Sequence, residues 1–328
     1  MLTINETLAR GLKDRFFADF ATEISGAFQK QLRSMSLRNI KRGKWVRAAR
    51  ECVDRLERFS IASYEGGSKA KPYFVTTVLE TLDSREYNTW NEKCLFSQQL
   101  LLSFDPAFVD CTPGRFSIGE HAIMRLFMRS PVGEDARGNL LPYSIIKQLA
   151  YVPLWSTFWI WFHKLTRKID FRDELSIVIP APNGVFIAHL SKEDNEVEIR
   201  TFIDDKSARD DRKIVRDLMM QVSEPLLDSP LSASPAVESA HLDWGSAYLT
   251  PVLCKRLAPH ADVLARCLFR KGNQNESGRD AGLLFREQLA QLAAMADSYW
   301  SMFENAPLRE FLAQANHRLR QAQRARSA

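Results

Sequence analysis

The spacing of apolar residues divides this chain into a helical beginning, a central segment of mixed periodicity and a helical end. Near the beginning, apolar residues recur at four-residue intervals, as in an amphipathic helix: Leu8, Leu12, Phe16, Phe20 and Ile24. Helical spacing continues to about residue 61 and returns over residues 86–102. We therefore predict a helical N-terminal region over residues 1–110.

The central segment combines helices with strands. Ser117 and Glu120 have the S-x-x-E spacing of a capping box, so a helix is expected to begin at Ile118. Three later runs have the residue types of strands and are joined by turn sequences: Ser176–Pro180, Gly184–Leu190 and Val197–Ile203. A further helix is expected over about residues 208–222.

The predicted fold class is α+β and helix-dominated. A core module over residues 111–223 contains a central antiparallel sheet of three to four strands with a helix before it. Residues 224–240 are rich in Pro and Ser and are typical of a linker. Residues 241–328 have helical spacing, so helical regions flank the core module on both sides.

The predicted helix after Ser117 carries a line of polar side chains on an otherwise apolar surface. His121, Arg125 and Arg129 lie four residues apart, within about 80° of each other around the helix axis. A helix with so wide an apolar surface is largely enclosed. Because an unpaired buried guanidinium is costly, the line is either neutralised by carboxylates or borders a cleft that accepts an anion.

The cleft alternative leads to a specific chemistry. A neutral imidazole can act as a general base, and guanidinium groups stabilise the charge that develops on phosphorus during RNA cleavage without a metal. In this interpretation His121 is the base, and Arg125 and Arg129 hold the phosphate. His189 could supply the proton for the leaving group, although a histidine in a strand is more often buried and hydrogen-bonded.

A helix with the pattern H-A-x-x-R-x-x-x-R followed by antiparallel strands resembles the RelE/BrnT-type ribonuclease toxins, which have the barnase–EndoU–RelE fold. The resemblance covers residues 116–205 and rests on these matching residues: His121, Ala122, Arg125 and Arg129. It implies that Arg200 and Thr201 face the cleft, with Thr201 among the catalytic residues and Arg200 among those that bind nucleic acid. Residues 131–172 have no counterpart in that family.

A second candidate site lies in residues 30–50, which are rich in cations and contain no acidic residue. The residues expected to bind nucleic acid there are Lys41, Arg42, Lys44, Trp45 and Arg47. The cations would follow a phosphate backbone, and the indole would stack on a base. The alternative is a solvated helix face without a partner.

Composition narrows the classes of protein. The hydrophobic fraction of 45% and the charged fraction of 26% are ordinary for a globular protein, and the net charge of +5 is compatible with nucleic acid without requiring it. The five cysteines have no CxxC spacing, and phosphate-loop and zinc motifs are missing, so we expect no metal and no cofactor. Unpaired cysteines and the lack of a signal peptide predict a cytoplasmic protein.

The most apolar run, Leu149–Phe162, is shorter than the roughly 20 residues that cross a bilayer. It is either core or a surface for a protein partner, and no membrane association is expected. The leading hypothesis is a nucleic-acid-directed protein, with RNA favoured over DNA, that acts as a metal-independent ribonuclease of toxin or defence type. The alternative is a non-enzymatic nucleic-acid-binding scaffold, or an adaptor that contacts proteins through its helical ends or its Trp-rich segment.

Overall fold

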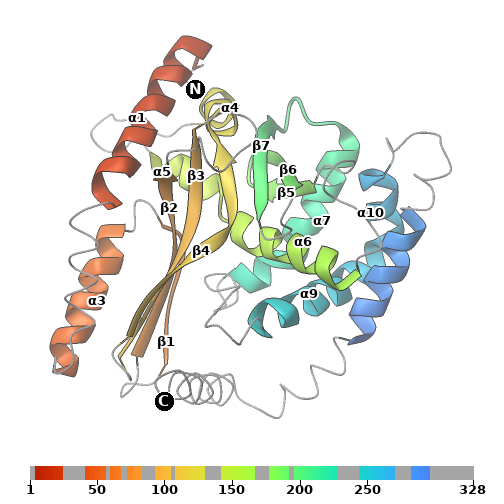
Figure 1. The fold of residues 1–328 in the computed structure, drawn as a ribbon. Coiled ribbons are helices and arrows are strands. Elements are labelled where there is room, and N and C mark those ends of the chain that lie inside the picture. The colour runs from red at the N-terminus through yellow and green to blue at the C-terminus, as the bar shows by residue number, and fades with distance from the viewer. Residues whose placement is uncertain are drawn as a thin grey trace.

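A single mixed sheet organises the molecule, with helices packed around it (Figure 1). The computed structural model describes residues 4–24, 41–56, 60–67, 72–82, 93–104, 108–129, 142–166, 177–191, 196–227, 244–269 and 282–295. Within these residues the sheet has seven strands in the order β1-β2-β3-β4-β7-β6-β5.

The sheet consists of two antiparallel parts that meet at one parallel pair. The first part is a meander of four strands: β1 (Ser60–Gly67), β2 (Pro72–Leu82), β3 (Cys94–Ser103) and β4 (Phe108–Gly119). The second part contains three strands: β5 (Ile177–Ala181), β6 (Gly184–Leu190) and β7 (Val197–Asp204). The two parts join because β4 runs parallel to β7, where Phe116 and Ile118 lie beside Val197 and Ile199.

This sheet corrects the fold class expected from the sequence. The prediction of a three- to four-stranded antiparallel sheet between helical regions is wrong, because residues 60–119 contribute four more strands and one strand pair is parallel. Residues 1–110 are therefore not helical throughout. The helical spacing assigned to residues 86–102 belongs in part to β3, whose two faces are both buried, for example at Leu95 and Leu100. Burial of both faces removes the alternation by which a strand is recognised.

The elements predicted in the core module agree better with the structure. The expected strands correspond to β5, β6 and β7, and the helix expected over residues 208–222 corresponds to α7 (Asp210–Leu227). The capping box, however, is wrong. Ser117 and Ile118 belong to β4, and the helix that follows, α4 (Glu120–Arg129), begins at Glu120.

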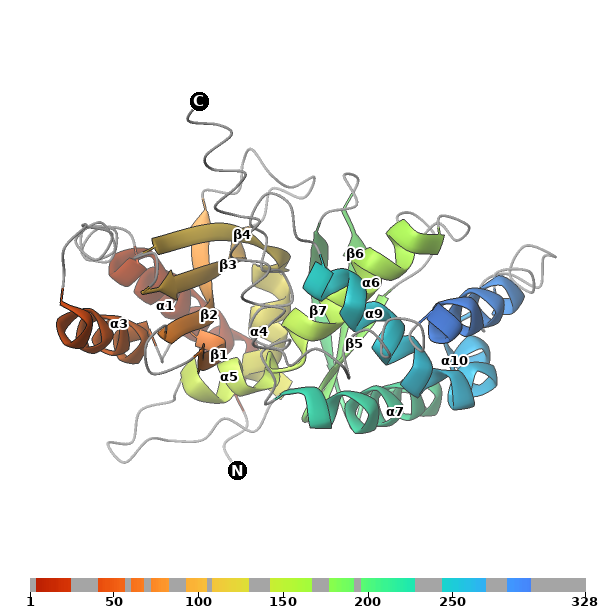
Figure 2. The same ribbon diagram turned by 90° about the horizontal axis from the view of Figure 1, so that it is seen from below.

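Different helices pack against the two parts of the sheet. On one side of the meander lie α1 (Glu6–Ile24) and α3 (Arg42–Leu56) (Figure 1). The other helices follow β4 along the chain: α4, α5 (Pro142–Gln148), α6 (Val152–Thr166), α7, α9 (Trp244–Leu257), the 3-10 helix Ala258–His260, α10 (Ala261–Leu268) and the helical residues 282–295. Of these, α6 and α7 pack against β5–β7, α9 packs on both of them and α10 packs on α7 (Figure 2).

A bulge in β4 changes the direction of the strand before it reaches β7. The pairing with β3 passes from Phe96 opposite Ser117 to Gln98 opposite Pro113, so β4 contains extra residues opposite Ser97. The Ser97 hydroxyl donates to the Phe116 carbonyl at 2.7 Å and accepts from the Phe116 N–H at 3.1 Å. Gly114 permits this approach, since a Cβ there would lie 2.1 Å from Ser97 Oγ.

The Trp-rich segment is core. Within α6, Trp155, Phe158 and Phe162 are almost completely buried and stack against one another or against Phe285. The Trp155 indole donates to Ser223 of α7 at 3.3 Å, so this helix also ties α7 to the core. Among the residues that the structure describes, no helix has the length and apolarity needed to span a membrane.

Candidate functional site

The helix α4 lies where the two parts of the sheet meet. β4 ends at Gly119 and α4 begins at Glu120, so no loop separates the two elements. The pairing of β4 with β7 ends at Ile118, after which β7 continues to Asp204 with α4 packed against it (Figure 1). The helix therefore covers the edge of β7 that β4 no longer pairs.

The first residue of α4 is held in place from two directions. The Glu120 N–H donates to the Lys93 carbonyl at 2.9 Å, and the Glu120 carboxylate accepts from Lys13 Nζ of α1 at 2.7 Å. Burial alone would lower the pKa of Lys13, but hydrogen bonds to Glu120 and Asp14 outweigh it and raise this pKa. The negative charge of Glu120 in the first turn also interacts favourably with the dipole of α4.

The predicted polar line is present on α4 and is partly exposed. The opposite surface of the helix is buried and packs into the core: Ala122, Ile123, Leu126 and Phe127. His121, Arg125 and Arg129 are each of intermediate exposure. The structure gives these three side chains different surroundings, and they do not form a uniform set.

Arg129 is bound to β7. Its guanidinium donates to the Phe202 carbonyl at 3.2 Å and lies 3.9 Å from the Asp204 carboxylate. Phe202 belongs to the stretch of β7 that extends past its pairing with β4. Arg129 thus satisfies a backbone acceptor at a sheet edge, which is a structural role.

Arg125 contacts His121 in place of a carboxylate. Its Nε donates to His121 Nε2 at 3.4 Å, and no ion pair of Arg125 with an acidic side chain is found in the described part of the chain. In this contact His121 Nε2 is the acceptor, so its lone pair faces Arg125.

The residues expected to face the site from the last strand lie on β7 at a bulge. Thr201 is paired with Ile187 and Ile199 with Ala188, so Arg200 is the extra residue of the strand. Arg200 forms an ion pair with Glu198. Thr201 is of intermediate exposure.

His189 lies directly opposite Glu198 in the β6–β7 pair. Burial lowers the pKa of His189, and the positive charge of Arg200 lowers it further, while Glu198 raises it to a smaller extent. His189, Glu198 and Arg200 thus form a cluster of interacting ionisable side chains in the sheet. The neighbouring residues Leu190 and Val197, which are the predicted ends of these strands, are also paired.

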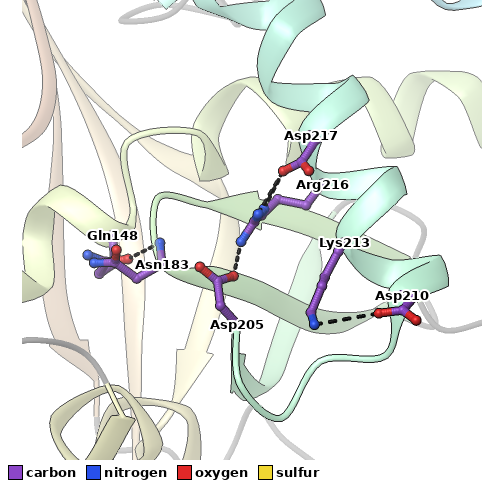
Figure 3. Close-up of polar contacts among 7 residues, drawn as sticks. All are labelled: Gln148, Asn183, Asp205, Asp210, Lys213, Arg216 and Asp217. Carbon is purple, nitrogen blue, oxygen red and sulfur yellow. Dashed lines mark hydrogen bonds and ion pairs between the residues drawn. The ribbon is translucent and has the colours of Figure 1, made fainter.

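Ion pairs also join charged residues in the first half of α7 and in the turn before it (Figure 3). Arg216 contacts both Asp205 and Asp217, the latter at 2.7 Å, and Lys213 Nζ lies 3.6 Å from Asp210. The acidic residues after β7 therefore serve the turn into α7, and we find no arrangement of three or more possible metal ligands within the described residues.

A second contact in the same view fixes the turn between β5 and β6. The Asn183 N–H donates to the Gln148 side-chain oxygen at 3.1 Å, which ties the turn to the end of α5 (Figure 3). The next residue, Gly184, is required by close packing, since a Cβ there would lie 2.2 Å from the Ile203 carbonyl oxygen. These contacts position strands and carry no chemistry.

The cations predicted to bind nucleic acid are on the exposed surface of α3. We call Lys41, Arg42, Lys44 and Arg47 the α3 cation face; all of them are exposed, and none has an ion pair with a carboxylate among the described residues. One turn further along, Arg50 does have such a partner, since it donates to Glu65 of β1 at 2.6 Å. No acidic residue lies in the first turn of α3.

Trp45 is placed differently from the expectation. It is completely buried, at 0% exposure, and its ring lies 6.2 Å from that of Phe74 and 5.5 Å from that of Phe104. It anchors α3 to the meander together with Ala49, Cys52 and Leu56 on the same side of the helix. In this position the indole cannot stack on a base.

Comparison of the chain with protein-family models, with curated proteins and with solved structures finds no match in any of the three. The function is therefore argued from the two candidate sites alone. Of the predicted site residues, the structure places His121, Arg125 and Arg129 on α4 and Arg42, Lys44 and Arg47 on α3. Lys41 lies directly before α3, and Arg200 and Thr201 lie on β7.

Proposed function

We propose that this protein binds nucleic acid, and RNA in preference to DNA, through the α3 cation face. The observation that supports the proposal is the exposure of these side chains without carboxylate partners in the described part of the chain. Exposed cations without partners attract the phosphate backbone and release its counterions when they bind.

The position of these cations within the helix adds support. Arg42 and Lys44 lie in the first turn of α3, where the helix dipole is positive, and cations are unfavourable there by about 0.3–1 kcal/mol each. A surface shaped by stability alone would carry acidic residues at this place. The pattern fits a face that is kept cationic for a partner.

The binding proposal is tested by fluorescence anisotropy with a labelled RNA and the DNA of the same sequence. We expect tighter binding of RNA, and an affinity that falls with salt concentration as expected when phosphate contacts are lost. The variant Arg42→Gln/Lys44→Gln should bind more weakly. Lys206→Gln, which removes an exposed cation in the turn before α7, is the control and should bind like the unaltered protein. Equal affinity of both variants would contradict the proposal.

A metal-independent ribonuclease centred on α4 is the second candidate function. The observation that favours it is the half-exposed contact between Arg125 and His121 Nε2, without a carboxylate on Arg125 in the described residues. In this candidate a phosphodiester replaces His121 as the partner of Arg125. The freed His121 Nε2 accepts the proton of the 2′-hydroxyl as the 2′-oxygen bonds to phosphorus, and the 5′-oxygen leaves with a proton from water.

The same arrangement revises the role of Arg129 within this candidate. Its guanidinium is already engaged by Phe202 and Asp204, so it positions α4 while Arg125 meets the phosphate. The resemblance to RelE/BrnT-type toxins remains a proposal of the same kind, with Arg200 and Thr201 as auxiliary residues.

Cleavage is tested with labelled RNA in the presence of EDTA. The ribonuclease candidate requires cleavage that survives chelation, yields a 2′,3′-cyclic phosphate and is lost in His121→Gln. His260→Gln, at the start of α10 and away from α4, is the matched histidine control. RNA that stays intact under conditions in which it is bound leaves binding as the function and removes the catalytic one.

A further inference from the structure

The aromatic cluster beneath α3 includes one ring that is only partly buried. Trp45 is completely buried and lies between two phenylalanine rings, 6.2 Å from that of Phe74 and 5.5 Å from that of Phe104. Phe74 is 3% exposed and belongs to the core, whereas Phe104 is of intermediate exposure and packs at the edge of the cluster. An aromatic side chain therefore retains exposed surface beside α3.

The contact with Trp45 places Phe104 next to the α3 cation face. Residues three and four positions apart are neighbours on a helix, so Lys41 and Arg42 lie beside Trp45. The Trp45 N–H donates to the Lys41 carbonyl at 3.1 Å, so the helical spacing holds as far as Lys41. Two cations of the face are thus neighbours of the residue on which Phe104 packs.

The Phe104 ring is held in place without being stacked on. Its plane is inclined at 58° to that of Trp45, so Trp45 does not occupy the position of a parallel stacked neighbour. The contact orders the ring, and the side chain keeps part of its surface in solvent. A ring that is ordered before a ligand arrives loses little conformational freedom on binding.

Cations beside a partly exposed aromatic ring are the combination that proteins use to hold unpaired strands. The cations follow the phosphates, and each base that stacks on a ring raises the affinity by about 5- to 150-fold. In a duplex the flat faces of the bases are covered by the neighbouring base pairs. Only a strand with unstacked bases can use such a ring.

From this combination we infer that Phe104 and the α3 cation face form one site for single-stranded RNA, in which a base stacks on Phe104 while the cations hold the neighbouring phosphates. The inference rests on the proposed function, since it specifies the form of the RNA that α3 binds. Every base has a flat face, so stacking tolerates any sequence. The site selects an unpaired strand and reads no particular base.

Binding of matched RNAs tests the inference. The probes are a labelled single strand of about 12 nucleotides, an abasic strand of the same length, the duplex of the same sequence and vesicles that contain phosphatidylserine. The abasic strand keeps the phosphates and lacks the bases, so it isolates the contribution of stacking. We expect the strand with bases to bind at least about fivefold more tightly than the abasic strand, and more tightly than the duplex.

Substitutions then assign the stacking to one ring. Phe104→Leu keeps an apolar contact with Trp45 and should remove the advantage of the strand with bases over the abasic strand, whereas Phe104→Trp should preserve it. Phe96→Leu is the matched control. Phe96 is also of intermediate exposure and lies about 26 Å away along the direction of β3, so its loss should leave the advantage unchanged.

The outcomes separate the inference from the proposed function. Equal binding of the strand with bases and the abasic strand would overturn the inference while leaving the proposed function in place. A Phe104→Leu variant that loses affinity equally for both strands would do the same, because the ring would then only support α3. A preference for the duplex would also overturn the inference alone. Binding to vesicles alone, or to no probe, would overturn both.

Discussion

The helices α3 and α7 both begin with a dense group of charges, and the two groups are arranged in opposite ways. In α7, Asp210 and Asp211 occupy the first turn, where the helix dipole favours them. In α3 the same place holds cations and no acidic residue. The first turn of α7 also contains Arg212 and Lys213, but its two aspartates balance them, whereas the cations in the first turn of α3 have no acidic residue beside them there.

Pairing separates the two helices as clearly as position does. Arg209, directly before α7, forms an ion pair with Asp211. Lys213 and Arg216 of α7 also contact aspartates (Figure 3), so these three cations are paired within the protein. The α3 cation face has no such contacts among the described residues. The comparison teaches that a count of cations is a poor guide to a binding surface, whereas cations that are exposed, unpaired and unfavourably placed are informative.

The largest expected effect comes from neutralising equal charge on the two helices. In 0.1 M salt each phosphate contact contributes about a five- to eightfold gain in affinity. Arg42→Gln/Arg47→Gln should therefore weaken RNA binding about 25- to 60-fold. Arg209→Gln/Lys213→Gln should change it less than about threefold, because both side chains already contact aspartates. Anisotropy titrations measure both, and similar losses would break the comparison.

The next effect concerns the stability of α7. Asp211 is buried and accepts hydrogen bonds from the Arg212 N–H at 2.9 Å and from Arg209 at 2.6 Å. Asp211→Ala removes a buried carboxylate that accepts both bonds, leaving the Arg212 N–H only its second acceptor, the Arg209 carbonyl at 3.0 Å, and should lower the free energy of unfolding by about 1–3 kcal/mol. The exposed neighbour Asp210 is the control, and Asp210→Ala should cost less than about 0.5 kcal/mol in the same urea titration.

On α4, we expect Arg129 to contribute to stability and Arg125 to contribute little. Arg129→Met removes the donor to the Phe202 carbonyl and should lower the free energy of unfolding by about 1–2 kcal/mol. Arg125→Met removes only a long contact to His121 and should cost less than about 0.5 kcal/mol. Urea titrations check the difference. Equal losses would show that Arg125 also has a structural role.

A smaller effect of opposite sign sharpens the case for α3. Arg42→Glu replaces an unfavourable charge in the first turn with a favourable one and should raise the free energy of unfolding by about 0.3–1 kcal/mol. The same variant should bind RNA more weakly. A gain in stability together with a loss of binding is the signature of a functional surface, and unchanged stability would weaken the argument from the dipole.

The smallest effect extends the comparison to a paired charge inside the sheet. Because burial and Arg200 lower the pKa of His189, the unfolded chain binds a proton there more readily than the folded protein does. Stability from this group is complete at neutral pH and is lost as pH falls through the ordinary value of 6.5. His189→Gln should flatten the decline in melting temperature between about pH 7 and pH 5; a decline as steep as that of the unaltered protein would contradict this assignment.

The sequence predicted the elements that have a clear apolar spacing or are bounded by recognisable turn residues. The turn sequence around Asn183 and Gly184 identified β5 and β6, and apolar spacing identified α4 and α7. Within the meander, β2 and β3 were missed because both of their faces are buried and include polar residues, such as Thr76, Ser97 and Gln99. Such strands lack the alternation on which recognition depends.

The sequence identified residues of the candidate sites but not the contacts that these residues make. Spacing placed His121, Arg125 and Arg129 on one line, which the helix preserves. Spacing could not reveal that Phe202 and Asp204 bind Arg129, because that contact depends on where β4 stops pairing with β7. The environment of Trp45 could not be read from the sequence either, because its sequence neighbours are cations but its neighbours in space are Phe74 and Phe104.

The direct passage from Gly119 of β4 to Glu120 of α4 has a consequence for how this part of the molecule meets a ligand. With no connecting segment to bend, α4 has no hinge at its start and moves only together with the strand that precedes it. A ligand that arrives beside His121 therefore encounters a preorganised surface and orders little backbone on binding, which keeps the entropic cost of the encounter low.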